Sequence, residues 1–590
     1  MTVTIEALNL APLSEASAML AGSYEHSPWV AEAALEQRPF KTLHHLKQVM
    51  AAVVRRSSAD QKLNLLRAHP ELAGKAMVNQ NLTHESSDEQ SRAGLTHCTP
   101  EEFEKLQSMN RSYNEKFGWP FILAVRGPRA QGLSRVQIIE TFERRLGQQA
   151  EAEMAECLRN IHRIVEIRLN DKFGVTSEDG NLVWDWAEAL SEHSEPSFKA
   201  KSQLATLYMT EAHRKVAAQL SLWMKECGFD EVEIDPVGNL VGRYRGSDPS
   251  RNVVMTGSHY DTVRNAGKYD GRLGILAPMA AVQRMARQGQ RWPFTLEVIG
   301  FAEEEGQRYK ATFLGAEAIV GNFNPNYLDL KDSDGISMLD AIGAPQGKAA
   351  LLSSIKAQAR RRELVDGFIE IHIEQGPVLL EGDHPLGVVT AINGSVRLMV
   401  EILGVASHAG TTPMAIRKDA AMAACELGVY LEKRAACEPN LVGTMGMLNV
   451  PSGSTNVVPG TCQFSLDIRA PGDGQRDQAV QDVLAELKSI CARRGLAVSI
   501  EETMRAAAAP SAPRWQARWE QVVDALGLEV FRLPSGAGHD AMKMAELCPQ
   551  SMLFVRCGNG GISHNPLETM TNDDAELSVQ AFTHYLNLLS

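Results

Sequence analysis

Hydrophobic side chains recur at helical spacing through the first 170 residues. The runs 43–54 and 154–169 place apolar residues three or four positions apart, and the alternation typical of β-strands is scarce. Prolines at Pro120 and Pro128, each beside a glycine or tryptophan, interrupt the helical pattern. The pattern predicts an all-helical domain that ends within 170–174.

The rest of the chain alternates short apolar runs with helical stretches. Four runs rich in β-branched and aromatic residues read as buried strands: 252–257, 294–301, 368–371 and 553–557. A helical stretch, 275–285, follows the first of them. Further on, strand-like runs alternate with amphipathic helices in a pattern that favours a small inserted α+β domain: 398–403, 418–431, 462–468 and 475–493.

These patterns predict a multidomain protein. A chain of 590 residues exceeds what one core normally supports. We expect an all-α domain over residues 1–172, an α/β domain formed by 173–390 and 507–590, and an inserted α+β domain over 391–506.

Composition narrows the function classes. The chain is 44% hydrophobic and 22% charged, which is ordinary for globular proteins, and its net charge of −13 argues against a nucleic-acid partner. Nine scattered cysteines without a Cys-x-x-Cys pair fit a reducing compartment. No secretory signal or membrane-length apolar run is visible. We therefore expect a cytoplasmic protein with no membrane partner.

Acids and histidines follow the four apolar runs. They supply five candidate metal ligands: His259, Asp270, Glu305, His372 and His564. A single histidine is more often structural, but strand ends of an open α/β sheet meet at one crevice, so the joint occurrence predicts a shared site. Imidazole and carboxylate ligands suit zinc or manganese, and a metal pair needs two or three ligands per ion plus a shared carboxylate. The sequence predicts a dinuclear hydrolase centre, with zinc and manganese both open.

Residues from about Phe173 onward resemble the metal-dependent amidohydrolases that cleave ureido groups: allantoate amidohydrolases, N-carbamoyl-L-amino-acid hydrolases and β-ureidopropionases. The resemblance rests on six motifs in order, at 257–263, 304–309, 372–379, 407–414, 536–542 and 563–566. It implies that Asp270 bridges two divalent ions and that Glu304 is the general base. Asp261 would orient a ligand imidazole, although an ordinary turn cap is the alternative for it.

The same resemblance implies a substrate clamp. The inserted domain would be a ferredoxin-like lid through which the protein forms a homodimer. Arg469 would fork the substrate carboxylate, since its donors match two oxygens in one plane. Asn456 would hydrogen-bond that carboxylate, and His408 would reach the reacting carbonyl in the partner subunit's site. Gln375 and His539 are further candidates for polar contacts. A surface ion pair is the alternative for Arg469.

Three segments of the helical domain resemble the decarboxylases of 2-oxo-4-hydroxy-4-carboxy-5-ureidoimidazoline (OHCU), which produce allantoin late in urate degradation. They are 68–72, 86–95 and 114–122. The resemblance implies that His69 is the catalytic acid or base and that Glu89 positions or protonates the reacting carbon. The substrate's polar groups would be bound by Ser86, Gln90 and Arg168, with Arg163 as the alternative to Arg168. No cofactor is expected in this domain, because the substrate's own imine and carbonyl can absorb the electrons left by carbon dioxide.

The fusion favours one substrate for the hydrolase. One domain resembles an enzyme that makes allantoin, and allantoate is the hydrolase substrate that belongs to that pathway. We therefore expect a bifunctional enzyme that acts on small ureides and needs a separate allantoinase between its two steps. N-carbamoyl amino acids remain alternative substrates, and the helical domain remains an alternative assembly module. A ligand sensor is disfavoured because Glu304 accompanies a full ligand set.

Overall fold

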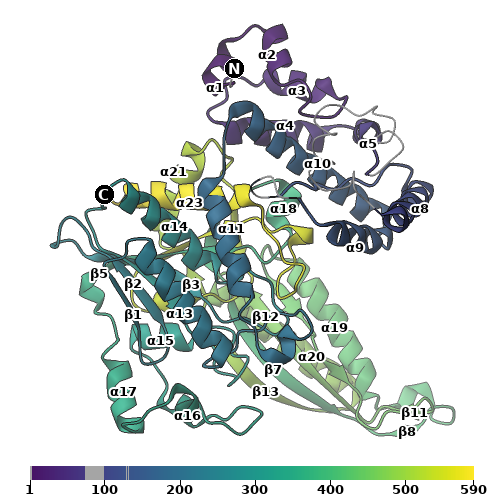
Figure 1. Ribbon diagram of the computed structural model, residues 1–590. Coiled ribbons are helices and arrows are strands. Elements are labelled where there is room, and N and C mark those ends of the chain that lie inside the picture. The colour runs from purple at the N-terminus through teal and green to yellow at the C-terminus, as the bar shows by residue number, and fades with distance from the viewer. Residues whose placement is uncertain (1–2, 73–98, 128, 130–131) are drawn as a thin grey trace.

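The computed structural model describes residues 3–72, 99–127, 129 and 132–590 (Figure 1). Its N-terminal region is helical, as the apolar spacing predicts. The helices are α1 (Ile5–Leu10), α2 (Leu13–Met19), α3 (Pro28–Leu35), α4 (Leu43–Arg56), α5 (Ala59–Ala68), α8 (Pro100–Phe117), α9 (Arg135–Leu146) and α10 (Ala150–Phe173). Their buried faces form one hydrophobic cluster that extends from Leu8 to Phe173.

Helix α10 is the longest of these helices and ends beside the rest of the molecule. It stops at Gly174, whose φ of 63° lies in the left-handed region that favours glycine. Helix α11 (Glu178–Ser191) follows after a short connection and packs against the C-terminal helix α23 (Asn572–Asn587). The chain thus passes from the helical region directly onto the face of the next domain (Figure 1).

A nine-stranded mixed sheet is the centre of the C-terminal region. Its order is β1-β2-β4-β3-β5-β16-β6-β14, with β15 also paired to β6. The strands are β1 (Glu231–Ile234), β2 (Leu240–Tyr244), β3 (Val253–His259), β4 (Leu296–Phe301), β5 (Val365–Ile373), β6 (Leu386–Ile392), β14 (Ala509–Pro510), β15 (Arg532–Ser535) and β16 (Gln550–Val555). Because β4, β3, β5 and β16 pair in parallel, their carboxyl ends share one edge of the sheet.

Helices cover both faces of this sheet. Residues of α11, α13 (Glu211–Glu226), α14 (Leu273–Arg287), α21 (Pro513–Ala525) and α23 join one hydrophobic cluster, and residues of α15 (Leu314–Val320), α18 (Val378–Gly382) and α22 (Asp540–Met544) join a second. Shorter helices are α12 (Pro196–Lys199), α16 (Met338–Ile342) and α17 (Lys348–Lys356). The two clusters hold the central strands in a buried position, which explains their nearly continuous apolar sequences.

Between β6 and β14 the chain forms a separate α/β unit with its own core. A five-stranded antiparallel sheet is covered by α19 (Ala420–Ala436) and α20 (Asp473–Arg494). Its strands are β7 (Gly394–Leu403), β9 (Val442–Thr444), β10 (Leu448–Asn449), β12 (Thr461–Ala470) and β13 (Ala497–Ala506). A two-stranded ribbon of β8 (Ser407–His408) and β11 (Val457–Val458) lies at its distal end (Figure 1).

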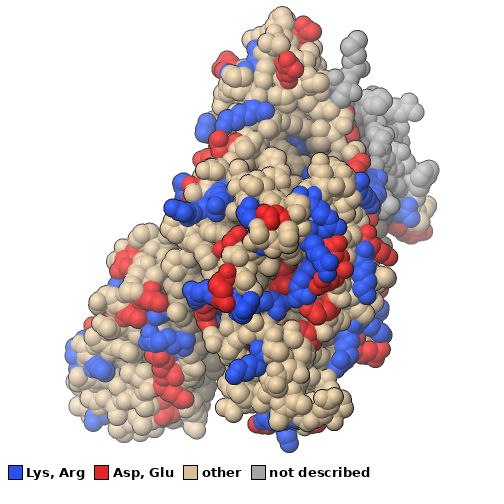
Figure 2. Space-filling model, turned by 90° about the vertical axis from the view of Figure 1, so that its left-hand side faces the viewer, with Lys and Arg blue, Asp and Glu red and all other residues tan. Residues whose placement is uncertain are grey.

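Charges are mixed on the surface. Figure 2 shows Lys and Arg side chains interspersed with Asp and Glu over one whole face. Among the described residues, no helix has the length and apolar character needed to cross a bilayer.

Candidate active sites

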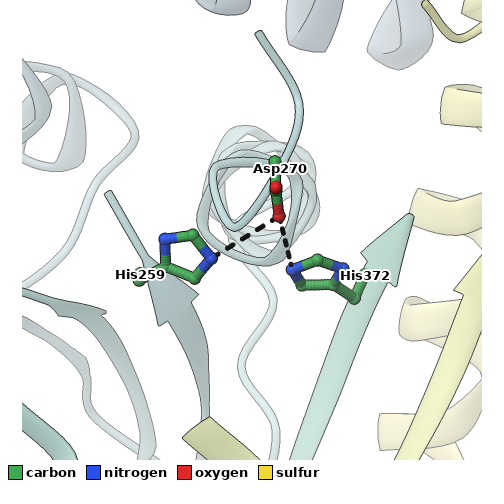
Figure 3. Close-up of side chains that lie close together, drawn as sticks. All are labelled: His259, Asp270 and His372. Atoms are coloured by element: carbon green, nitrogen blue, oxygen red, sulfur yellow. Dashed lines mark ion pairs between the residues drawn. The ribbon is translucent and has the colours of Figure 1, made fainter. Parts of the chain in front are cut away.

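Asp270 lies on the turn that leads into α14, and its two carboxylate oxygens face different partners. Oδ1 is 3.6 Å from Nε2 of His259 and 3.3 Å from Nε2 of His372, at the ends of β3 and β5 (Figure 3). Oδ2 is 3.1 Å from Nε2 of His564. A carboxylate that offers one oxygen to each of two ligand groups has the arrangement needed to bridge two cations.

The five predicted metal ligands converge on these two groups. His259, Asp270 and His372 form the first, while Asp270, Glu305 and His564 form the second, and within each the ligand atoms lie within 4.8 Å of one another. Nε2 of His564 is 3.3 Å from Oε1 of Glu305. Segments nearly 300 residues apart in the sequence thus meet at the carboxyl ends of the parallel strands.

In His259 and His372, Nδ1 contacts a backbone carbonyl, and Nε2 is the ring atom on the side of Asp270. Nδ1 of His259 lies 3.1 Å from the Asp261 carbonyl oxygen, and Nδ1 of His372 lies 2.8 Å from that of Ile373. Donation from Nδ1 leaves each Nε2 as an acceptor on the side of Asp270. Nε2 of His372 accepts a hydrogen bond from the Gly271 N–H at 3.1 Å, which a bound cation would replace. Oδ1 of Asp270 is buried without a hydrogen-bond partner among the described residues. Because buried acceptors are normally satisfied, this orphaned oxygen and the surrounding donor set fit a divalent cation.

Asp261 connects the first ligand group to the acidic segment after β4. Its carboxylate oxygens accept hydrogen bonds from the backbone N–H of Glu304 at 3.1 Å and of Glu305 at 3.3 Å. One of them also lies 3.4 Å from Nδ1 of His259. Asp261 therefore contacts both the His259 imidazole and the backbone of Glu304 and Glu305.

Glu304 occupies an environment suited to a base. Desolvation and the neighbouring Glu305 carboxylate raise the pKa of Glu304 above its usual value. A carboxylate with a raised pKa accepts a proton more readily near neutral pH. Glu304 also shares a ligand-distance group with His259 and Glu305, so it borders the cation positions directly.

Gln375 and His539 lie beside the same centre. Nε2 of Gln375 donates to Oδ2 of Asp270 at 2.9 Å and is 3.3 Å from Nε2 of His564. The His539 ring centroid is 4.4 Å from that of His372, and Nε2 of His539 is 2.8 Å from Oγ of Ser535. Both side chains therefore present polar atoms at the edge of the candidate metal centre.

A separate candidate site, a cavity, lies in the helical region around His69, where α5 ends. His69 is 7% exposed, and its Nε2 has no hydrogen-bond partner among the described residues. Burial lowers the pKa of His69 to about 4, so the ring is neutral at neutral pH. The cavity is lined by His69, Pro70, Leu72, residues 121–126, Ile164, Ile167 and Arg168.

Arg168 points into this cavity, whereas Arg163 does not. Nη1 of Arg168 donates to Oε2 of Glu25 at 2.8 Å and to the Gly22 carbonyl at 3.1 Å. Arg163 instead contacts Asp573 at the start of α23. Of the two arginines left open by the sequence, Arg168 is the one among the described lining residues of the cavity beside His69. Ser86, Glu89 and Gln90 lie outside the described residues.

Comparison with known proteins matches the same two regions. Residues 9–170 match the OHCU decarboxylase family model, and residues 255–588 match that of peptidase family M20/M25/M40. The chain belongs to peptidase family M20/M25/M40. It carries an OHCU decarboxylase domain before its M20 domain, and each domain belongs to a family of enzymes.

Curated relatives of the M20 domain include ureido-cleaving enzymes. The chain is 34% identical to an N-carbamoyl-L-amino acid amidohydrolase of Geobacillus stearothermophilus, over 69% of this chain and 97% of the relative. It is also 34% identical to an allantoate amidohydrolase of Bacillus subtilis, over 70% and 98% respectively. A solved amidase of the hydantoinase/carbamoylase family from Burkholderia multivorans is 27% identical with a TM-score of 0.63, over 69% of this chain and 97% of that one.

Within the M20 region, the predicted clamp residues lie in two separate places. Arg469, on β12, donates to the Gly536 carbonyl at 2.7 Å, so it faces the loop that leads to His539. Its fork is also engaged by Asp467, at 3.0 and 2.7 Å. His408 and Asn456 are exposed on and beside the β8–β11 ribbon at the distal end of the inserted unit (Figure 1). A single chain therefore does not bring these two residues to its own metal centre.

Sequence reasoning missed two acids that support the M20 centre. Glu568 accepts hydrogen bonds from the backbone N–H of Tyr269 at 2.8 Å and of Asp270 at 3.1 Å. Glu370, buried on β5, accepts from Ser258 Oγ at 2.7 Å and from the Ala541 N–H at 2.9 Å. A signal existed for Glu568, since an acid four residues after a ligand histidine in a turn-rich segment is well placed for the same site.

Proposed function

We propose that the chain is a bifunctional ureide-pathway enzyme. Its N-terminal domain would decarboxylate OHCU to (S)-allantoin, and its M20 domain would hydrolyse allantoate to ureidoglycine, ammonia and carbon dioxide. The arrangement of ligands around Asp270 carries the hydrolytic half of the proposal. The OHCU decarboxylase domain in the same chain supports allantoate over other ureido substrates.

The residues present have separable tasks in hydrolysis. Divalent ions, zinc or manganese, would be held by His259, Asp270, Glu305, His372 and His564 and would supply Lewis acidity that acidifies water and polarises a carbonyl. Glu304 would take the proton of the attacking water and deliver it to the leaving nitrogen as the C–N bond breaks. Asp261 would keep the His259 tautomer fixed while this proton moves.

Decarboxylation needs a positioned carboxylate and one proton. Arg168, held by Glu25, would bind the substrate within the cavity, and Glu89, Ser86 and Gln90 are proposed to complete its contacts. As the C–C bond breaks and carbon dioxide leaves, the electron pair enters the conjugated imine and carbonyl. His69 would serve as the acid or base that delivers the proton to one face.

We further propose the domain boundaries 1–172, 173–390 with 507–590, and 391–506, with the inserted unit acting as a lid and dimerisation domain. Apolar side chains exposed on it support a homodimer: Met414, Ile416, Met422 and Val429, each between 48 and 76% exposed. Dimerisation would allow His408 and Asn456 of one subunit to complete the site of the other.

Substrate profiling tests the proposed function. Purified protein reconstituted with zinc or manganese should bind two ions per chain, hydrolyse allantoate in preference to N-carbamoyl amino acids, and convert OHCU to optically active allantoin. Ammonia release, metal analysis and polarimetry on one preparation measure all three. Preference for carbamoyl amino acids would support the rival substrate, and absent decarboxylation would support an assembly role for the helical domain.

Arg469→Ala should raise KM for allantoate roughly 10- to 100-fold, because a charge-assisted bidentate contact contributes about 1.5–3 kcal/mol. Metal content should stay at the parent value. Arg397→Ala is the matched control, since Arg397 also contacts Asp467, at 3.2 Å, on the same sheet. Equal KM values for the two variants would remove Arg469 from the substrate clamp.

A further inference from the structure

The segment between β16 and α23 is central to the candidate metal centre. We define residues 556–574, which run from the end of β16 through the first three residues of α23, as the His564 loop. It supplies His564 itself, and its Glu568 fixes the backbone N–H of Asp270. Ser563 Oγ donates to Glu568 at 2.7 Å. The loop therefore provides one ligand and orients the carboxylate that serves both cation positions.

His564 depends on this loop more than the other ligands depend on their surroundings. Its side chain is 50% exposed, whereas those of His259, Asp270 and His372 are at most 6% exposed. Packing holds the buried ligands in place, but a half-exposed imidazole is held mainly by the backbone that carries it. Whatever fixes the loop consequently fixes the second cation position.

The two ends of the His564 loop are tied to each other and to the decarboxylase domain. Nη2 of Arg556, at its start, lies 2.9 Å from Oδ1 of Asp574, at its end. The same Nη2 lies 3.2 Å from Oε1 of Glu166 on α10. Arg163 of α10 pairs with Asp573, and its Nη2 donates to Asn572 at 2.7 Å.

These contacts come from one side of α10 and are largely buried. Arg163, Glu166 and Asn170 are spaced three and four residues apart, and Nδ2 of Asn170 donates to Asp573 at 3.1 Å. The Asp573 and Asp574 side chains are 7% and 3% exposed. Removing one partner of a buried ion pair is strongly destabilising, because the other charge is left buried and uncompensated. The network therefore constrains the ends of the loop strongly.

Beside these contacts, α10 and the loop border a cavity. It has a volume of about 160 Å³ and is lined on the helix by Arg159, Asn160 and Arg163 and on the loop by Gly558, Asn559 and Thr569. The helix therefore restrains the loop through its ends. Arg159 lines this cavity too, but its described ion pair is with Glu156 of the same helix, at 2.7 Å.

We propose that α10 of the decarboxylase domain positions the metal centre of the hydrolase domain, with Arg163 and Glu166 as positioning residues that clamp the ends of the His564 loop. This inference rests on the proposed metal centre. It makes the decarboxylase domain a structural requirement for full hydrolase activity, in addition to its own chemistry.

The test compares Arg163→Ala/Glu166→Ala with Arg159→Ala in the full-length protein. In the metal-free state, amide hydrogen exchange of residues 556–574 should accelerate in the double variant only. Calorimetric titration with Mn²⁺ should show the affinity of one of the two ions reduced about 10-fold or more, as for other residues that orient metal ligands. Turnover of allantoate should fall, while OHCU decarboxylation stays at the parent rate and reports an intact helical domain.

Loop exchange and Mn²⁺ affinity equal to those of Arg159→Ala would overturn the proposal. If the double variant fails to fold, Glu166→Gln replaces it, because this change keeps the side-chain shape and removes the charge that faces both Arg556 and Arg163; unchanged exchange in that variant would overturn the proposal equally. A parent protein that binds neither Mn²⁺ nor Zn²⁺ would refute the proposed metal centre, and the exchange comparison would still decide whether α10 restrains the loop.

Discussion

Glu304→Gln should reduce kcat for allantoate hydrolysis by about 10²- to 10⁴-fold, the range expected when a general base is removed. The amide has nearly the same shape as the carboxylate but cannot accept the proton of the attacking water. KM should change little, because the proposed substrate contacts come from other residues. Ammonia release under saturating allantoate measures the effect.

Two further measurements on this variant make the result specific. Metal content should remain at two ions per chain, since Glu305 and the three histidines are unchanged. OHCU decarboxylation should continue at the parent rate, because His69 lies in a separate domain. A Glu304→Gln protein that retains its metals and hydrolyses allantoate normally would eliminate Glu304 as the base.

His69→Ala should reduce the rate of OHCU decarboxylation by about 10²- to 10⁴-fold, the range expected when a general acid or base is removed. Nε2 of His69, which has no hydrogen-bond partner among the described residues, lies in a buried cavity, and the lowered pKa of the ring keeps it neutral at neutral pH. Loss of the ring removes the only imidazole among the described residues that line this cavity. Formation of optically active allantoin, followed by circular dichroism, measures the loss.

Hydrolysis of allantoate is the internal control for His69→Ala. It should match the parent, since the substitution leaves the contacts between α10 and the His564 loop intact. Parent-level production of one allantoin enantiomer by the variant would contradict the role of His69. Together with Glu304→Gln, the variant tests whether the two reactions can be switched off separately.

The central sheet and the convergence of the candidate ligands were predictable because strand periodicity and ligand chemistry are local signals. His259 and His372 are at or near the ends of parallel strands, so their convergence follows from topology. The ligand Asp270 was identified from its glycine-rich turn, and its contacts with both groups agree with a bridging position. Such features depend on a few neighbouring residues and on a general rule of sheet geometry.

Contacts between domains were not predictable in this way. Arg163 was a candidate for the decarboxylase cavity, because nothing near it in the sequence indicates an aspartate 410 residues away. For Arg469 the sequence left an ion pair and a substrate clamp both open, since two residues on one strand face can either pair or bind a ligand; the structure shows the pair with Asp467. The Arg163 contact depends on how two separately folded surfaces meet, and a pattern within one segment does not encode that.

Helix α10 contributes to two cavities at once: Ile164, Ile167 and Arg168 line the first, while Arg163 and Glu166 border the second. Any change of helical phase, by insertion or deletion, would misplace both sets together. Substitutions on α10 should therefore be tolerated less well than on a helix that lines a single cavity. An engineer who exchanges the decarboxylase for a free-standing homologue would need to graft these side chains as well.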